Sequence, residues 1–226
     1  MATTFQRARS DEQRAQRSQA ILDTAAAMLQ EMPVADLSLN ELSRRVGLAK
    51  SNVLRYFDSR EAVLLELLDS RTREWLAHLA VELPSAVARS AAFKRRAEQL
   101  ATAIAESLAE RPVLCDLLAA QAGVLEHNVS AEAVARHKLA GLADAELLAG
   151  LVRDALPELS PDDAWRYVIG TWLMASALWA HARPPEAVLE AIGADERLQR
   201  MRLDLPVALA DHLTTLAIGL DARATG

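Results

Sequence analysis

Hydrogen-bonding side chains are concentrated on one face of a short segment near residue 50. Ser51, Asn52 and Arg55 have a spacing that brings them together on a helix, and Lys50 precedes them. A short helix with such a face fits the DNA major groove, where Arg can bind guanine and Asn can bind adenine. We therefore predict that Arg55 contacts a guanine; a contact with phosphate alone is the alternative.

Two short helical patterns, joined at a glycine, would hold this face in place. Ser38 and Glu41 have the spacing of a capping box, which begins a helix. Gly47 can adopt the left-handed conformation that ends it. Each helix has its own apolar edge, formed by Leu39, Leu42 and Val46 in the first and by Leu48, Val53 and Phe57 in the second. The pattern predicts a helix-turn-helix.

The segment from Ile21 to about Leu68 resembles the DNA-binding domain of the tetracycline-repressor (TetR/AcrR) family of bacterial transcription regulators. The matching motifs are Ile21–Ala26, Ser38–Ser43, Val46–Phe57 and Ser59–Glu61. Three positions depart from the family pattern. Leu54 replaces a usual aromatic residue, Ala49 replaces a usual Ser or Thr cap, and Met32-Pro33 stands where a glycine is common.

The resemblance implies a homodimeric transcription regulator, most simply a repressor, that binds a palindromic operator in double-stranded DNA. It assigns Lys50, Ser51 and Asn52 to base edges or phosphates, and Tyr56 and Arg60 to phosphates. Arg44 and Arg45 are either phosphate neighbours or solvated side chains. The predicted DNA-binding residues are Ser38, Asn40, Arg45, Lys50, Ser51, Asn52, Leu54, Arg55, Tyr56 and Arg60.

The rest of the chain is rich in alanine and leucine and has no strand-like alternation, so the predicted fold class is all-α. We expect a disordered basic arm over 1–9, a three-helix DNA-binding domain over 10–58 and a helical regulatory, ligand-binding and dimerisation domain over 59–226. Prolines divide this last part into expected helices at 85–110, 112–124, 130–155, 161–182, 185–192 and 205–220. The helices 161–182 and 205–220 are the candidates for a dimer interface.

Charge and cysteine content limit the possible functions. Of 25 basic and 31 acidic residues, 11 of each lie in residues 1–75, which leaves 14 basic and 20 acidic residues in the remainder. The acidic excess therefore lies outside the expected DNA-binding end. The single cysteine and the lack of a secretory or membrane-spanning pattern favour a cytoplasmic location. No catalytic or metal-binding motif occurs, so we expect no enzyme activity, cofactor or metal.

Three tryptophans, Trp165, Trp172 and Trp179, repeat every seven residues and share one stripe of an expected helix. The stripe could be core, a subunit interface or the wall of a ligand cavity. The apolar composition and its few polar groups predict an apolar or aromatic effector. The candidate ligand-binding residues are Cys115, Gln121, Trp172 and Ser176. Two alternatives stay open: a DNA binder of this family without a ligand, and a helical enzyme or interaction module.

Overall fold

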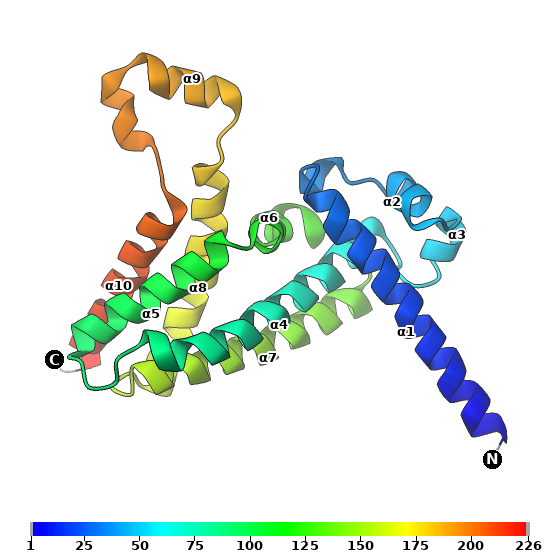
Figure 1. Cartoon of the computed structure of the whole chain (residues 1–226), viewed down its shortest axis with the longest axis horizontal. Coiled ribbons are helices and arrows are strands. Elements are labelled where there is room, and N and C mark those ends of the chain that lie inside the picture. The colour runs from blue at the N-terminus through cyan, green and yellow to red at the C-terminus, as the bar shows by residue number, and fades with distance from the viewer. Residues whose placement is uncertain (1, 225–226) are drawn as a thin grey trace. The chain divides into compact units, whose positions relative to one another are not determined.

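The computed structural model describes the backbone of residues 2–224 and the side chains of residues 12–223, and within this part every regular element is helical (Figure 1). The described chain forms two compact units. Unit 1 comprises the residues up to Asp69 together with Ala120–His137, and unit 2 comprises Ser70–Ala119 and the residues from Lys138 onward. The predicted all-α fold class is confirmed.

Unit 1 is built around the middle of the long helix α1. Its elements are α1 (Ala2–Leu29), η1 (Val34–Asp36), α2 (Leu39–Val46), α3 (Lys50–Val53), the first turns of α4 (Arg60–Ala86), the π-helical turn η2 (Gln121–Leu125) and the first turns of α7 (Ala131–Ala155). Its buried core includes Ile21, Ala25, Met28, Leu37, Leu42, Val53 and Leu64. The apolar stripe of α1 is therefore the surface on which the short helices pack.

The start of α1 differs from the expectation. The helix begins at Ala2, so residues 2–9 are helical where the sequence predicts a disordered arm. Residues 2–29 contain neither glycine nor proline and are rich in Ala, Arg and Gln, which have high helix propensity. Pro33 follows the end of the helix, as predicted.

Unit 2 is a helical bundle. Its elements are the rest of α4, α5 (Phe93–Ala109), α6 (Pro112–Ala120) up to Ala119, the rest of α7, α8 (Pro161–Ala182), α9 (Glu186–Ala194), η3 (Glu196–Met201) and α10 (Leu205–Ala224). Helix α10 packs against α5 and α8. Gly170 lies at the α8–α10 contact, where a Cβ atom would stand 2.5 Å from Leu216 Cδ2.

The proline-based boundaries are close to those observed, with one exception. Pro112 and Pro161 begin α6 and α8, and Ser160 Oγ caps α8 by accepting a hydrogen bond from Asp163 N at 3.1 Å. The expected helix 85–110 is wrong at its start. Helix α4 continues through Pro84 to Ala86, and α5 begins only at Phe93.

The tryptophan stripe of α8 is divided among different surroundings. Trp172 packs edge-to-face on the buried Trp75, with ring centroids 5.3 Å apart. Trp179 is buried, donates its indole N–H to Asp116 at 2.7 Å, and stacks under the Arg183 guanidinium. Trp165 is exposed. The first two tryptophans therefore belong to the packing of unit 2, and only Trp165 lies on an open face.

Candidate DNA-binding site

Helix α2 begins and ends as its sequence predicts. Ser38 is its N-cap and accepts a hydrogen bond from Glu41 N at 3.2 Å. Gly47 ends it with a φ of 72°, and Leu48 N donates to Ser43 O at 3.0 Å. A side chain at position 47 would be strained in this left-handed conformation, which explains the glycine.

Only half of the expected capping box forms. The Glu41 carboxylate is bound by Arg44 at 2.6 Å and by Arg45 at 2.9 Å, on the following turn of the same helix. These hydrogen bonds, that of Arg44 foremost, lower the pKa of Glu41 to about 2. The carboxylate therefore stays ionised throughout the physiological pH range, and it competes with any phosphate for the two arginines.

The segment after Gly47 is a short helix that continues as turns. Ala49 is extended, α3 covers Lys50–Val53, and Phe57 N still donates to Val53 O at 3.1 Å. Val53 and Phe57 are buried and fix the segment to unit 1. The seven residues Lys50–Tyr56 form what we call the reading segment.

The polar face of the reading segment points away from its buried anchors. Lys50, Ser51, Asn52, Leu54 and Arg55 are all exposed, and Tyr56 is half-buried. Within the described part of the chain neither Lys50 nor Arg55 forms an ion pair. Exposed, unpaired donors on a short buried-edge helix are the arrangement that the sequence predicts for groove recognition.

Other predicted DNA-binding residues are less available. Arg45 binds Glu31 at 2.6 Å as well as Glu41, so its charge is already compensated within unit 1. Arg60 donates from Nη2 to Val34 O at 3.0 Å, while its buried Nε lacks a hydrogen-bond partner. Arg60 therefore connects the start of α4 to the loop after α1, a structural contact that the sequence does not reveal. Ser38 caps α2, whereas Asn40 lies exposed beside it.

A second strip of chain supports the reading segment. Ser130, which caps α7 by accepting from Ala133 N at 3.2 Å, also donates to Asp58 Oδ2 at 3.0 Å. Asp58 directly follows the reading segment and its anchor Phe57. Residues 120–137 thus belong to the same compact unit as the short helices, although about 60 residues separate them in sequence.

A buried polar chain lies in the same region. His137 Nδ1 is 2.6 Å from Asp69 Oδ1, and both residues are buried. His137 Nε2 is 2.9 Å from the amide nitrogen of Gln121, which also donates to Glu126 at 3.0 Å. A neutral His137 that donates to Asp69 and accepts from Gln121 satisfies all three groups. Sequence analysis missed this network because its members are far apart in the chain.

A polar cavity of about 390 Å³ opens beside this network within unit 1. One wall is the end of the reading segment, with Arg55 and Tyr56, and the opposite wall comes from α7, with Arg136 and His137. Arg14 of α1 and Glu66 of α4 close the sides. Arginines and carboxylates alternate around the cavity, so its lining favours no single charge.

The four candidate ligand-binding residues do not form one site. Gln121 belongs to unit 1 and is used in the His137 network, whereas Cys115, Trp172 and Ser176 belong to unit 2. Ser176 donates to Leu118 O at 3.3 Å, and the Cys115 thiol donates to Leu108 O at 3.3 Å. The predicted grouping of Gln121 with the other three is wrong, because the turn η2 places Gln121 with His137.

Burial controls the reactivity of the only cysteine. Desolvation raises the pKa of Cys115 to about 12, so the thiol stays protonated at neutral pH. We expect Cys115 of the folded protein to resist iodoacetamide at pH 8 and to react fully once the chain is unfolded in guanidinium chloride. Mass spectrometry after timed quenching measures this, and rapid modification of the folded protein would contradict the buried placement.

Two further searches concern the described residues alone. None of their helices combines the length and the apolar character that crossing a membrane requires. No cluster of three His, Cys, Asp or Glu side chains among them could hold a metal ion.

Comparisons with known proteins agree with this geometry. The model of bacterial regulatory proteins of the tetR family matches residues 21–67, and that of the tetracyclin repressor-like C-terminal domain matches residues 69–224. The chain is 45% identical over 53 residues to the HTH-type transcriptional regulator EthR of Mycobacterium tuberculosis. This segment spans 24% of either protein, about a quarter of the curated relative's length.

Solved structures share the fold over most of the chain. FadR, the fatty acid degradation regulator of Bacillus halodurans, aligns with a TM-score of 0.55 at 14% identity, over 89% of this chain and 94% of its own. A possible TetR family regulator from Streptomyces coelicolor aligns with a TM-score of 0.55 at 20% identity, over 93% and 99%. With both of its parts matched by family models, the chain belongs to the TetR family of transcriptional regulators.

Proposed function

We propose that this regulator is a homodimeric repressor, that each copy inserts its reading segment into the major groove of a palindromic operator, and that a mostly apolar molecule bound in unit 2 releases it. The observation that carries the DNA-binding part is the exposed Ser51, Asn52 and Arg55 face, held by buried Val53 and Phe57. Arg55 is proposed to read a guanine, and Lys50 and Tyr56 to contact phosphates.

The dimer interface is proposed on α8 and α10. Trp165, Ile169 and Leu173 are exposed at four-residue spacing on α8, and Val207 and Ile218 are exposed on α10. Three apolar residues on one stripe of a helix are the pattern of a helix-packing surface. A symmetric pair of these faces would form a four-helix interface and would present two reading segments to two half-sites.

The effector is proposed to bind in unit 2 near Trp75 and Trp172. The Tyr167 hydroxyl is buried in unit 2 and has no hydrogen-bond partner, and such a group is a candidate for a ligand contact. The crystal structure of FadR from Bacillus subtilis, aligned at 14% identity with a TM-score of 0.53, is described as a complex with stearoyl-CoA. That complex supports a long acyl chain as the first effector class to examine. Helix α4 contributes to both units and is the proposed covalent route of the response.

The observed packing favours one runner-up. Trp172, Ser176 and Cys115 are all used in contacts within unit 2, as expected of a DNA binder whose regulatory part has no ligand. Titration with stearoyl-CoA separates the two proposals, with tryptophan fluorescence and operator release followed in parallel. The effector proposal requires both signals to change with the same midpoint. Fluorescence quenching with unchanged operator affinity would contradict the coupling, and an absence of both signals with this and other apolar probes would favour the runner-up.

A further inference from the structure

Residues 184–204 form a projecting segment between α8 and α10, which we call the arm. Within it α9 packs against η3, and Gln199 Nε2 donates to Ile192 O at 3.0 Å. Figure 1 shows the arm, in orange, extending beyond the adjoining ends of the two helices. The arm is therefore a hairpin of its own, joined at both ends to the helices of the proposed dimer face.

The arm has too little core to explain its helix. Helix α9 has nine residues, and isolated helices shorter than about 12–15 residues are marginal in water. Ile192 is buried, but Val188, Leu189 and Met201 are exposed, Met201 by 70%. A short helix with uncovered apolar side chains implies a surface on which it packs.

The apolar exposure indicates which surface this is. Eight of the fourteen large exposed apolar side chains in the described chain lie between residues 161 and 224. They are Trp165, Ile169 and Leu173 of α8, Val188, Leu189 and Met201 of the arm, and Val207 and Ile218 of α10. The arm thus continues the proposed dimer face along the chain, so a second copy of this protein is the occupant that the pattern favours.

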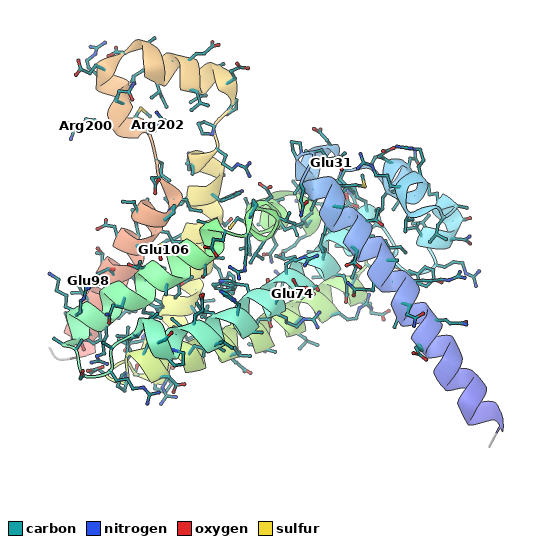
Figure 2. The ribbon with its side chains drawn as sticks, viewed as in Figure 1. Glu31, Glu74, Glu98, Glu106, Arg200 and Arg202 are labelled. Atoms are coloured by element: carbon teal, nitrogen blue, oxygen red, sulfur yellow. The ribbon has the colours of Figure 1, made fainter. Side chains whose placement is uncertain are left out.

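Unit 2 also contains a matching recess. An open depression of about 360 Å³ lies between α8 and α10 and is lined by Met174, Thr215 and Leu216, with Asp211 and His212 at its edge. Its largely apolar lining can receive an apolar side chain such as that of Met201. The charges also correspond, because Arg200 and Arg202 flank Met201 and an acidic residue, Asp211, borders the depression. Figure 2 shows both arginines where the arm returns toward α10.

We propose that the arm of each copy embraces the other copy, with Met201 in the depression between α8 and α10 of its partner and Arg200 or Arg202 beside Asp211 of the partner subunit. This proposal rests on the proposed homodimer and adds to it a reciprocal apolar and ionic contact. By two-fold symmetry the contact forms twice, so each substitution in the arm acts at two places.

Sedimentation equilibrium of the full chain measures the dimer dissociation constant and tests the proposal. Met201→Glu is expected to raise this constant at least about tenfold, because it places two charges in apolar recesses. Leu139→Glu is the matched control, since Leu139 of α7 is exposed by 66% and lies outside the proposed contact. The control is expected to leave the dissociation constant and the circular dichroism spectrum unchanged.

Charge reversal tests the pairing itself. Asp211→Arg and the double change Arg200→Glu with Arg202→Glu are each expected to weaken the dimer. The triple variant restores opposite charges in both contacts and is expected to return the dissociation constant to within about threefold of the wild-type value. A wild-type dimer that Met201→Glu and Leu139→Glu affect equally, or a triple variant as weak as the sum of its parts, would overturn the arm proposal and leave the homodimer standing. A wild-type monomer at micromolar concentration would overturn both.

Discussion

Replacing Leu173 by glutamate is expected to convert the protein from a dimer to a monomer and to lower operator affinity about a thousandfold. Leu173 is 66% exposed near the middle of α8, within the stripe that also contains Trp165 and Ile169. In a symmetric interface the change places two carboxylates in one apolar patch, where desolvated charge is costly. A monomer has one reading segment, and its affinity falls toward the non-specific range.

Leu139→Glu is again the control, because Leu139 has the same 66% exposure on a helix outside the proposed interface. Light scattering gives the mass of each variant, and fluorescence anisotropy with labelled operator gives its affinity. A Leu173→Glu protein that remains a dimer, with wild-type operator affinity, would contradict the placement of the interface on α8.

Arg55→Ala is expected to weaken operator binding by about 1–3 kcal/mol and to relax the preference at one base pair in each half-site. The exposed Arg55 projects from the reading segment and forms no ion pair within the described chain, so its removal breaks no ion pair there. The free energy of unfolding is therefore expected to stay within about 0.5 kcal/mol of the wild-type value. A panel of operators with single base changes, measured by anisotropy at fixed salt, reads out the preference.

Arg55→Lys separates charge from geometry in the same experiment. Lysine keeps the charge but lacks the planar fork that binds guanine through two hydrogen bonds. If Arg55 reads a base, the lysine variant also loses preference at that position. If Arg55→Ala weakens binding equally on every sequence and lysine restores it, the side chain contacts phosphate alone.

Local signals in the sequence were sufficient for the parts of the fold that adjacent residues decide. Ser38 and Gly47 bound α2 because capping and a left-handed glycine depend only on neighbouring residues. Pro112 and Pro161 begin helices for the same reason. Pro84 was misleading, since α4 continues past it for two residues before ending.

Contacts between distant residues could not be predicted in this way. Asp69 and His137 are 68 residues apart, and no spacing rule relates them. The same holds for Arg60, whose predicted phosphate contact ignores its hydrogen bond to Val34, and for Gln121, which the sequence groups with residues of the other unit. The exposed polar face of the reading segment was predictable because buried Val53 and Phe57 share its short helix and turn. The arm was not, because nothing in its sequence distinguishes a projecting helix from a packed one.

Specific DNA binding through the reading segment is the central claim, and one comparison tests it most directly. Anisotropy titrations at physiological salt compare duplexes tiled across the DNA upstream of the coding sequence with the same duplexes after scrambling. We predict that one palindromic duplex binds at least about a thousandfold more tightly than its scrambled form, with one dimer or a pair of dimers bound, and that Asn52→Ala combined with Arg55→Ala abolishes this preference. Equal affinity for native and scrambled duplexes, or a preference that survives the double substitution, would contradict the account.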